Sequence, residues 1–318
     1  MVFSSALIPA CQYVVSGVLL TSPRPLDLVP ADQDTPFLCR LTGQEAPLSL
    51  PLPGDGWQDI GLAMWVRPGA VFLSVHGLAR FLVTQDGGLS LDVEPGADQG
   101  MLSHYLCGHV LGAFLHLRGL LPLHASCLVR DGVAVAIAAE RGTGKSTLGA
   151  ALSARGWRPL ADDVVLLAPD GDGRMMAWPG PARFRLSSLS LAGISLPPSY
   201  QDYPLAESGK RTVWPPPGHW LNHPVPLSAM IDMTAGGEEI PRLERLSLTQ
   251  TVAVLHSHVF RRRLIARLGA SHDFARQCLS LAAQIQGFRL VRPAGFDGLD
   301  ALISAVGDAA ELAGQSSS

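Results

Sequence analysis

The sequence predicts an α/β protein in which a smaller strand-rich region, residues 1–100, precedes a larger α/β domain, residues 101–313. Short apolar runs separated by turn residues fill the first hundred positions, which is typical of a small β-rich unit. From residue 121 onward the pattern alternates strand, glycine-rich turn, helix and strand, as in an α/β layer. A composition of 47% hydrophobic and 16% charged residues over 318 positions allows a sizeable core.

In the N-terminal region the clearest strands lie in AMWVRPGAVFLSVHGLARFLVTQDGGLSLDVEP, residues 63–95, with a hairpin turn at residues 86–88. A helix follows, because Leu102, Tyr105, Leu106, Val110 and Phe114 recur at helical spacing and Gly119 lies near its end. We place the domain boundary just before this helix.

The larger domain begins with two apolar strands, 124–129 and 133–139, joined by a turn. A helix that stops at Gly156 and a strand over 164–169 come next. Residues 196–226 are dense in Pro and Gly, which favours a functional or disordered loop. The rest predicts a strand at 227–233, helices at 248–268 and 272–285, a strand at 287–293, a closing helix at 297–310 and a disordered tail at 314–318.

Residues 139–146, AERGTGKS, follow the Walker A pattern, with Ala139 at the position where Gly is commonest. Glycines turn backbone N–H groups toward phosphates, Lys145 reaches the β- and γ-phosphates, and the Ser146 hydroxyl binds Mg²⁺. The preceding strand and following helix are the context that this motif requires. The stretch therefore predicts a site for ATP, or another nucleoside triphosphate, with Mg²⁺; its residues are Gly142, Thr143, Gly144, Lys145, Ser146 and Thr147.

Asp162 and Asp163 follow Lys145 after one helix and a turn. Adjacent carboxylates repel each other unless a metal or a proton lies between them. Beside a triphosphate, one can hold Mg²⁺ and the other can accept the proton of an attacking hydroxyl. Without the phosphate loop, two solvated acids in a turn would be the simpler interpretation; with it, the pair predicts phosphoryl transfer.

His124, the phosphate loop and RGWRPLADDVVLL, residues 155–167, together resemble the catalytic domain of HPr kinase/phosphorylase. The resemblance implies that Asp162 is the general base and that Asp163 helps Ser146 to hold Mg²⁺. It also implies that His124 lies near the phosphates or the acidic pair, although a buried structural histidine is an equal alternative.

Two segments of that family are absent. WPGPARFRLSS stands near the place of Glu-Ile-Arg-Gly-Leu-Gly, and HPVPLSAM near that of Pro-x-x-Pro-Gly-Arg-Asn. The chain is more similar to the HPr kinase-like proteins of lasso-peptide biosynthesis, which phosphorylate a precursor peptide. We therefore expect a kinase acting on a Ser hydroxyl, that of the C-terminal Ser of such a peptide. The alternatives are a kinase of a small hydroxylated metabolite and a non-catalytic nucleotide-sensing module.

Further basic residues are candidates for the same site. Arg183 and Arg185 could bind a phosphate or the carboxylate of the peptide, or form surface ion pairs. Lys210 and Arg211, in the Pro-rich segment, could close over the γ-phosphate as a lid. The Arg residues at 261, 262, 263 and 267 fall on the predicted helix, where a solvated charged face is commoner than a substrate site.

Composition limits the partners. A net charge of −3 argues against general nucleic-acid binding. The apolar N-terminus lacks a positive n-region and is interrupted too often for a membrane span. The dispersed, odd set of 5 cysteines is typical of reduced thiols in the cytoplasm, where we expect the protein. The oligomeric state stays open.

Overall fold

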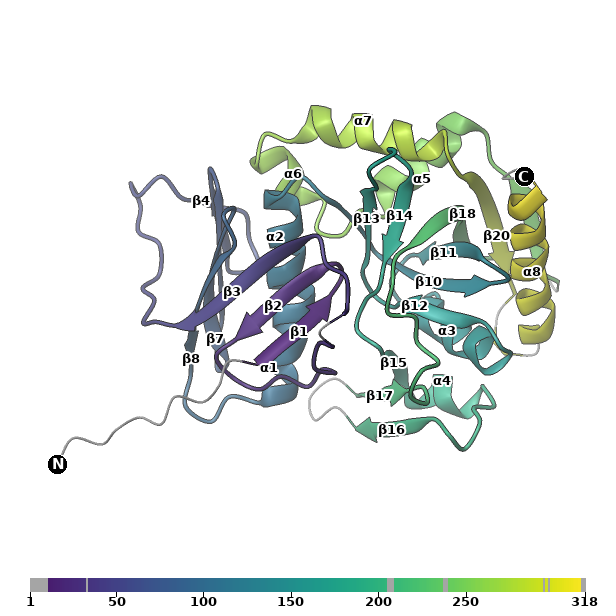
Figure 1. The fold of residues 1–318 in the computed structure, drawn as a ribbon, viewed down its shortest axis with the longest axis horizontal. Helices are drawn as coiled ribbons and strands as arrows, with labels where there is room; N and C mark the ends of the chain where they lie inside the picture. Colours follow the sequence, from purple (N-terminus) through teal and green to yellow (C-terminus); the bar gives the residue numbers. More distant parts are fainter. Residues whose placement is uncertain are drawn as a thin grey trace.

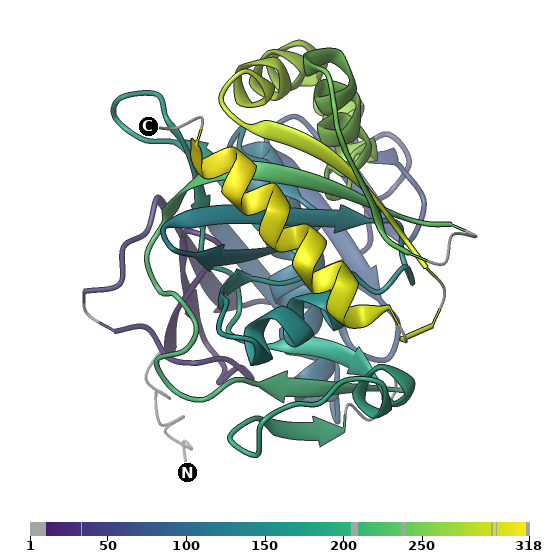
Figure 2. The same cartoon turned by 90° about the vertical axis from the view of Figure 1, so that its right-hand side faces the viewer.

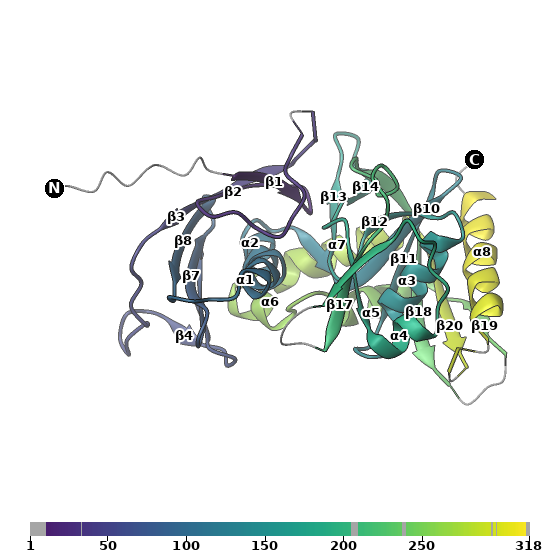
Figure 3. The ribbon, with the colours of Figure 1, turned by 90° about the horizontal axis from the view of Figure 1, so that it is seen from below.

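The computed structural model describes residues 11–32, 34–204, 209–236, 240–293, 295–296 and 298–315. Two parts lie side by side: an N-terminal sheet and a larger α/β part, with a helical segment between them (Figures 1 and 3). No helix in the described ranges is both long enough and apolar enough to cross a bilayer.

An eight-stranded sheet forms the N-terminal part, in the order β1-β2-β3-β8-β7-β6-β5-β4. Its strands are β1 (Cys11–Val15), β2 (Val18–Ser22), β3 (Cys39–Glu45), β4 (Gln58–Asp59), β5 (Met64–Arg67), β6 (Ala70–Val75), β7 (Ala79–Thr84) and β8 (Gly88–Val93). The predicted turn at 86–88 joins the antiparallel strands β7 and β8. The region is therefore rich in strands, as its sequence predicts.

The predicted helix is present as three consecutive pieces, α1 (Gln99–Tyr105), the π-helical turn η1 (Leu106–Val110) and α2 (Leu111–Leu117). The predicted apolar stripe packs in one core with the N-terminal strands: Leu102, Leu106, Val110 and Phe114 are buried in it, and Tyr105 is partly buried against it. A boundary after residue 100 would separate this helix from the sheet that it covers. Packing instead places the helix with the N-terminal part.

The larger part is built on a nine-stranded sheet with the path β12-β10-β11-β18-β14-β13-β9, extended by β20 beside β18 and β19 beside β20. The strands are β9 (Leu121–Leu123), β10 (Ala125–Arg130), β11 (Val133–Ala139), β12 (Arg158–Ala161), β13 (Val165–Pro169), β14 (Met175–Trp178), β18 (Val225–Ala235), β19 (Arg242–Arg245) and β20 (Gln286–Arg292). At its centre β11, β18 and β20 run parallel. Such neighbouring parallel strands end at the same edge of the sheet, which is where an α/β protein places its site.

Helices cover both faces of this sheet. α3 (Lys145–Ala154) and α8 (Leu299–Gln315) pack on one face, and Figure 2 shows α8 lying across the strands. α5 (Leu248–Ser257), α6 (Arg263–Arg267) and α7 (Ser271–Ala282) contribute to the core on the other face. The helix α8 includes Gly314 and Gln315, so the disordered tail predicted from residue 314 begins too early; residues 316–318 lie outside the described ranges.

The single helix predicted over 248–268 is wrong, because the chain leaves the helical path between α5 and α6. Val259 forms an isolated bridge with Leu123, and the His258 carbonyl accepts the N–H of His124 at 2.8 Å. Because these backbone groups bond to residues 123 and 124, they cannot form the i to i−4 hydrogen bonds that would continue the helix. Arg261 then adopts a left-handed φ of 55° before α6 begins.

The Pro-rich segment 196–226 contains regular structure. A three-stranded sheet, in the order β15-β17-β16, joins β15 (Phe184–Ser187), β16 (Gln201–Pro204) and β17 (Lys210–Trp214). The short helix α4 (Ser188–Ala192) follows β15. Phe184 and Val213 of this small sheet share a core with Ala150 of α3, which holds the sheet beside the phosphate loop.

Candidate functional site

The loop of residues 139–146 lies between a strand and a helix, which is the context that its sequence predicts. It leaves β11 after Ala139 and enters α3 at Lys145. Gly142 and Gly144 have φ angles of 89° and 100°, which L side chains adopt only under strain. The N-terminal amides of α3 therefore open toward the loop, where a helix attracts anions. Lys145 is 8% exposed and lines the cavity described below.

A residue that the sequence did not single out anchors this loop. Arg292, at the end of β20, donates from Nη1 to the Thr143 carbonyl at 2.8 Å and from Nη2 to the Gly295 carbonyl at 2.7 Å. Thr143 lies on the loop 149 positions earlier in the chain, so no local pattern could reveal the contact. Arg292 thus ties the loop to the strand next to β18.

The acidic pair follows β12 directly. Asp162 is 4% exposed, and its Oδ1 accepts a hydrogen bond from the Ser126 hydroxyl on β10. Asp163 is partly exposed and has a φ of 73°, a conformation that Asp tolerates better than most residues. The two carboxylates thereby face different surroundings although they are adjacent in sequence.

His124 lies beside the acidic pair. Its Nδ1 is 2.8 Å from the backbone carbonyl and 3.2 Å from Oδ1 of Asp163. Burial alone would raise the pKa of Asp163, but the hydrogen bond and charge of His124, together with Lys145, lower it well below its usual range. Asp163 is therefore an anion at any physiological pH, which suits a metal ligand better than a base.

One cavity of about 510 Å³ collects most of the predicted site residues. Those that line it are His124, Gly142, Gly144, Lys145, Ser146, Thr147, Asp162, Asp163 and Lys210. The phosphate loop, the acidic pair and the small sheet thus meet at one place. Thr143 lines an adjoining cavity instead.

The predicted basic residues divide into two groups. Arg185 and Lys210 project into the cavity from the paired strands β15 and β17. Burial, and then the charge of Arg185, lower the pKa of Lys210. Within the described residues neither side chain has a carboxylate at salt-bridge distance, although the charges of Asp162 and Asp163 act on both from across the cavity. Such a pair is suited to a polyanion.

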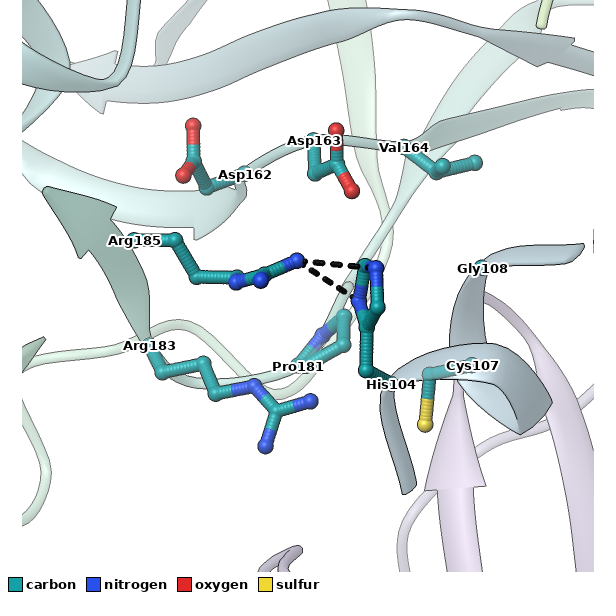
Figure 4. Close-up of a pocket in the computed structure, with 9 residues that line it drawn as sticks. All are labelled: His104, Cys107, Gly108, Asp162, Asp163, Val164, Pro181, Arg183 and Arg185. Atoms are coloured by element: carbon teal, nitrogen blue, oxygen red, sulfur yellow. Dashed lines mark hydrogen bonds between the residues drawn. The ribbon is translucent and has the colours of Figure 1, made fainter. Parts of the chain in front are cut away.

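Arg183 and Arg211 are engaged elsewhere. Arg183 donates to the backbone carbonyl of Asp27 at 2.7 Å, in the N-terminal part, and lines only a small adjoining pocket that also reaches Asp162 and Asp163 (Figure 4). Arg211 forms an ion pair with Asp202 on the neighbouring strand β16. Neither lines the 510 Å³ cavity, and their binding to nucleotide stays a prediction.

The N-terminal part contributes a wall of this cavity. His104, Tyr105, Gly108 and His109, from α1 and η1, lie opposite the phosphate loop. Burial and the charge of Arg185 lower the pKa of His104 to about 4. Burial and the charge of Arg261 lower that of His109 to about 3. Both imidazoles are therefore neutral at pH 7, and neither was a candidate from sequence.

A second cavity, of about 950 Å³, adjoins the first and shares with it His124, Glu140, Arg141, Phe260 and Arg261. It lies against the first half of the phosphate loop, residues 139–143, and not against Ser146 or Thr147. In the Walker A pattern the start of the helix binds the α- and β-phosphates, and the lysine reaches toward the γ-phosphate. A nucleotide bound in this way would turn its γ-phosphate toward the second cavity.

Two of the charged groups that line the second cavity lie outside the phosphate loop. Asp232, on β18, accepts a hydrogen bond from Nε2 of His258 at 3.0 Å and lies 3.4 Å from Nη2 of Arg289. Arg261 stands at the junction of both cavities, with its guanidinium 5.5 Å from the centre of the Phe260 ring. Among the described residues no carboxylate pairs with Arg261. The charge of Asp163 acts on Arg261 from the first cavity, but no described carboxylate lies at salt-bridge distance from it.

The donors present fit Mg²⁺. This ion takes one or two carboxylates and completes its shell with waters and phosphate oxygens. Ser146 and Asp163 line the same cavity, and Asp163 is held as an anion. No group of three or more His, Cys, Asp or Glu that could hold a metal occurs in the described part of the chain. The site thus suits a metal bound together with nucleotide phosphates.

The chain was compared with known families, curated proteins and solved structures. No protein-family model matches the chain, and no curated protein does. Among solved structures, the Hpr(Ser) kinase/phosphatase from Coxiella burnetii matches with a TM-score of 0.32 and 15% sequence identity. The match covers 62% of this chain and 94% of that one.

Proposed function

We propose that the protein is an ATP- and Mg²⁺-dependent kinase that transfers the γ-phosphoryl group to a hydroxyl. The observation that carries this proposal is that Lys145, Asp162 and Asp163 line one cavity at the start of α3. Nucleotide binding alone requires only the loop and the lysine. Phosphoryl transfer also requires a base and a metal ligand, and a buried carboxylate next to an anionic one can fill these two roles.

In the proposed reaction the oxygen of the acceptor hydroxyl forms a bond to the γ-phosphorus, while the bond to the β–γ bridging oxygen breaks and ADP leaves. The hydroxyl proton passes to Asp162, whose second oxygen is left for the acceptor because Ser126 donates to Oδ1. Lys145, Arg185 and Lys210 hold the phosphate charge. Mg²⁺, bound through Ser146 and Asp163, would neutralise the charge that develops between the β- and γ-phosphates.

The acceptor that we propose is the C-terminal Ser of a peptide, that of a lasso precursor. The sequence resemblance supports this choice. So does Arg261, an unpaired cation at the γ-phosphate side of the loop, because a C-terminal Ser carries a carboxylate next to its hydroxyl. A free hydroxy acid presents the same pair of groups, so a metabolite kinase is the second candidate.

Two substitutions test the proposal. In Asp162→Asn, phosphoryl transfer to a Ser-ended peptide should fall by roughly 10²–10⁴-fold, while affinity for ATP stays nearly unchanged. In Lys145→Ala, ATP affinity and transfer should fall together. Transfer is measured as a mass increase of about 80 Da on the peptide, and affinity by calorimetry.

If the Asp162→Asn variant transfers the phosphoryl group at the wild-type rate, Asp162 is not the general base. ATP binding without transfer to peptides ending in Ser, to peptides with internal Ser or to free serine would favour a nucleotide-sensing module. Transfer to free serine alone would favour the metabolite kinase.

A further inference from the structure

The π-helical turn η1 changes which side chains of the N-terminal helix point to the same side of the helix axis. His104 and His109 are five positions apart, which in a regular α-helix places side chains about 140° apart around the axis. The turn η1 begins after Tyr105 and contains His109, and the two rings come to a centroid separation of 6.0 Å. Both then line the cavity of the phosphate loop. Single π-turns inside helices frequently occur at functional sites.

His104, in the N-terminal part, forms a hydrogen bond with Arg185 of the larger part. Nη1 of Arg185 lies 2.6 Å from Nδ1 and 3.1 Å from Nε2 of His104. Figure 4 shows the guanidinium pointing at this ring, beside Asp162 and Asp163. Because burial keeps His104 neutral, the imidazole accepts the hydrogen bond without adding a second positive charge.

The contact orients Arg185 but does not neutralise it. Nε of Arg185 is buried without a hydrogen-bond partner, and no carboxylate in the described residues pairs with the guanidinium. A cation held by a neutral acceptor keeps its full charge for a ligand. Arg183, two positions earlier, is held by the N-terminal part as well, through the Asp27 carbonyl.

We propose that the N-terminal part completes the phosphoryl-transfer site, with His104 as a positioning residue that aims Arg185 at the γ-phosphoryl group. This inference rests on the proposed kinase function, and it assigns the strand-rich region a place in the reaction. Arg185 lies next to the acidic pair, so its contribution is to the charge of the group in transfer.

The test compares His104→Ala, His104→Asn, Arg185→Ala and the double variant His104→Ala/Arg185→Ala in the full chain. For His104→Ala we expect kcat to fall about tenfold or more, the size of a lost hydrogen bond to a charged group, while KM for ATP changes less than about threefold. Asn offers an acceptor near the position of Nδ1, so His104→Asn should recover most of kcat. In the Arg185→Ala background, His104→Ala should cost less than about twofold.

Ser103→Ala is the matched control. Ser103 is fully buried one position earlier on the same helix, where it accepts from Asp27 and donates to the Gln99 carbonyl. It does not line the cavity, so its loss should lower the melting temperature and leave kcat unchanged.

The inference is overturned if His104→Ala keeps the wild-type kcat, if His104→Asn is as impaired as His104→Ala, or if the effects of His104→Ala and Arg185→Ala multiply independently. Failure of the kinase proposal is distinguishable, because it would appear in Asp162→Asn and Lys145→Ala whatever the His104 variants do.

Discussion

Gly144 of the phosphate loop has a backbone conformation that a residue with a side chain adopts only under strain. Gly144 has a φ of 100°, and a Cβ at this position would lie 2.8 Å from Nη1 of Arg292. The same Arg292 nitrogen donates to the Thr143 carbonyl. A side chain at residue 144 therefore both strains the backbone and displaces the anchor of the loop.

Gly144→Ala should lower the free energy of unfolding by about 1–2 kcal/mol and also weaken ATP binding. Gly156→Ala is its control: Gly156 has a φ of 90°, but a Cβ there would meet no atom within 4 Å, and the residue follows the far end of α3. The control should lose similar stability and keep its ATP affinity. Calorimetry and thermal unfolding of both variants check this; unchanged ATP affinity in Gly144→Ala would contradict the role given to Arg292.

At the scale of elements, the break between α5 and α6 forms part of the site. A continuous helix would place the arginines of 261–267 around one solvated surface, as their sequence pattern predicts. Instead Arg262, Arg263 and Arg267 are exposed, while Arg261, with its left-handed φ of 55°, lines both cavities. Strain of this kind persists only where the surroundings hold it, and it often marks a functional residue.

Arg261→Gly removes the charge and leaves a residue that adopts this φ without strain. We expect KM for a peptide with a free C-terminal carboxylate to rise about tenfold, with KM for ATP nearly unchanged. With a C-terminally amidated peptide, the variant and the wild type should behave alike. Arg262→Ala, at the exposed neighbour, should match the wild type on both peptides. Equal loss on both peptides would exclude the carboxylate as the group that Arg261 binds.

At the scale of the whole molecule, the two parts share apolar contacts as well as the cavity. The N-terminal core includes Leu166 and Trp178 of the larger sheet. Phe260 passes so close to α2 that a Cβ on Gly112 would lie 2.5 Å from its ring, and its carbonyl is 2.6 Å from Nε2 of His116. The site at this junction therefore depends on the parts staying packed together.

The histidines at the junction make stability depend on pH. Folding lowers the pKa of His104 from 6.5 to about 4 and that of His109 to about 3. Between these values and 6.5 the unfolded chain binds more protons than the folded protein, so stability falls as the pH drops through this range. The melting temperature should decline from pH 6.5 toward pH 4, and less steeply in His109→Phe than in the wild type. The control is His272→Asn, at an exposed histidine, in which the melting temperature should depend on pH as in the wild type. If the melting temperature of His109→Phe falls as steeply as that of the wild type, His109 does not contribute to the pH dependence of stability.

Much of the central layer was predictable because its signals are local. The strand before residue 139, the loop and the helix after it are encoded by apolar runs and glycines within a few positions of one another. The contacts of Arg292 with Thr143 and of Arg185 with His104 join residues 149 and 81 positions apart, and no spacing predicts them. The hairpin of β16 and β17 was missed for a related reason: Pro and Gly residues are dense on both sides of it, and pairing with β15 decides its structure.

By itself, the sequence determined a glycine-rich loop of the Walker A pattern between a strand and a helix, followed by two acidic residues, because each depends on a short stretch of chain. Only the tertiary structure decided that His104 and His109 of the N-terminal helix face this loop, that Arg185 and Lys210 rather than Arg183 and Arg211 enter its cavity, and that Arg261 leaves the helix to join them. The physical reason is that a π-turn, a strand pairing and a broken helix are settled by backbone partners supplied from distant segments.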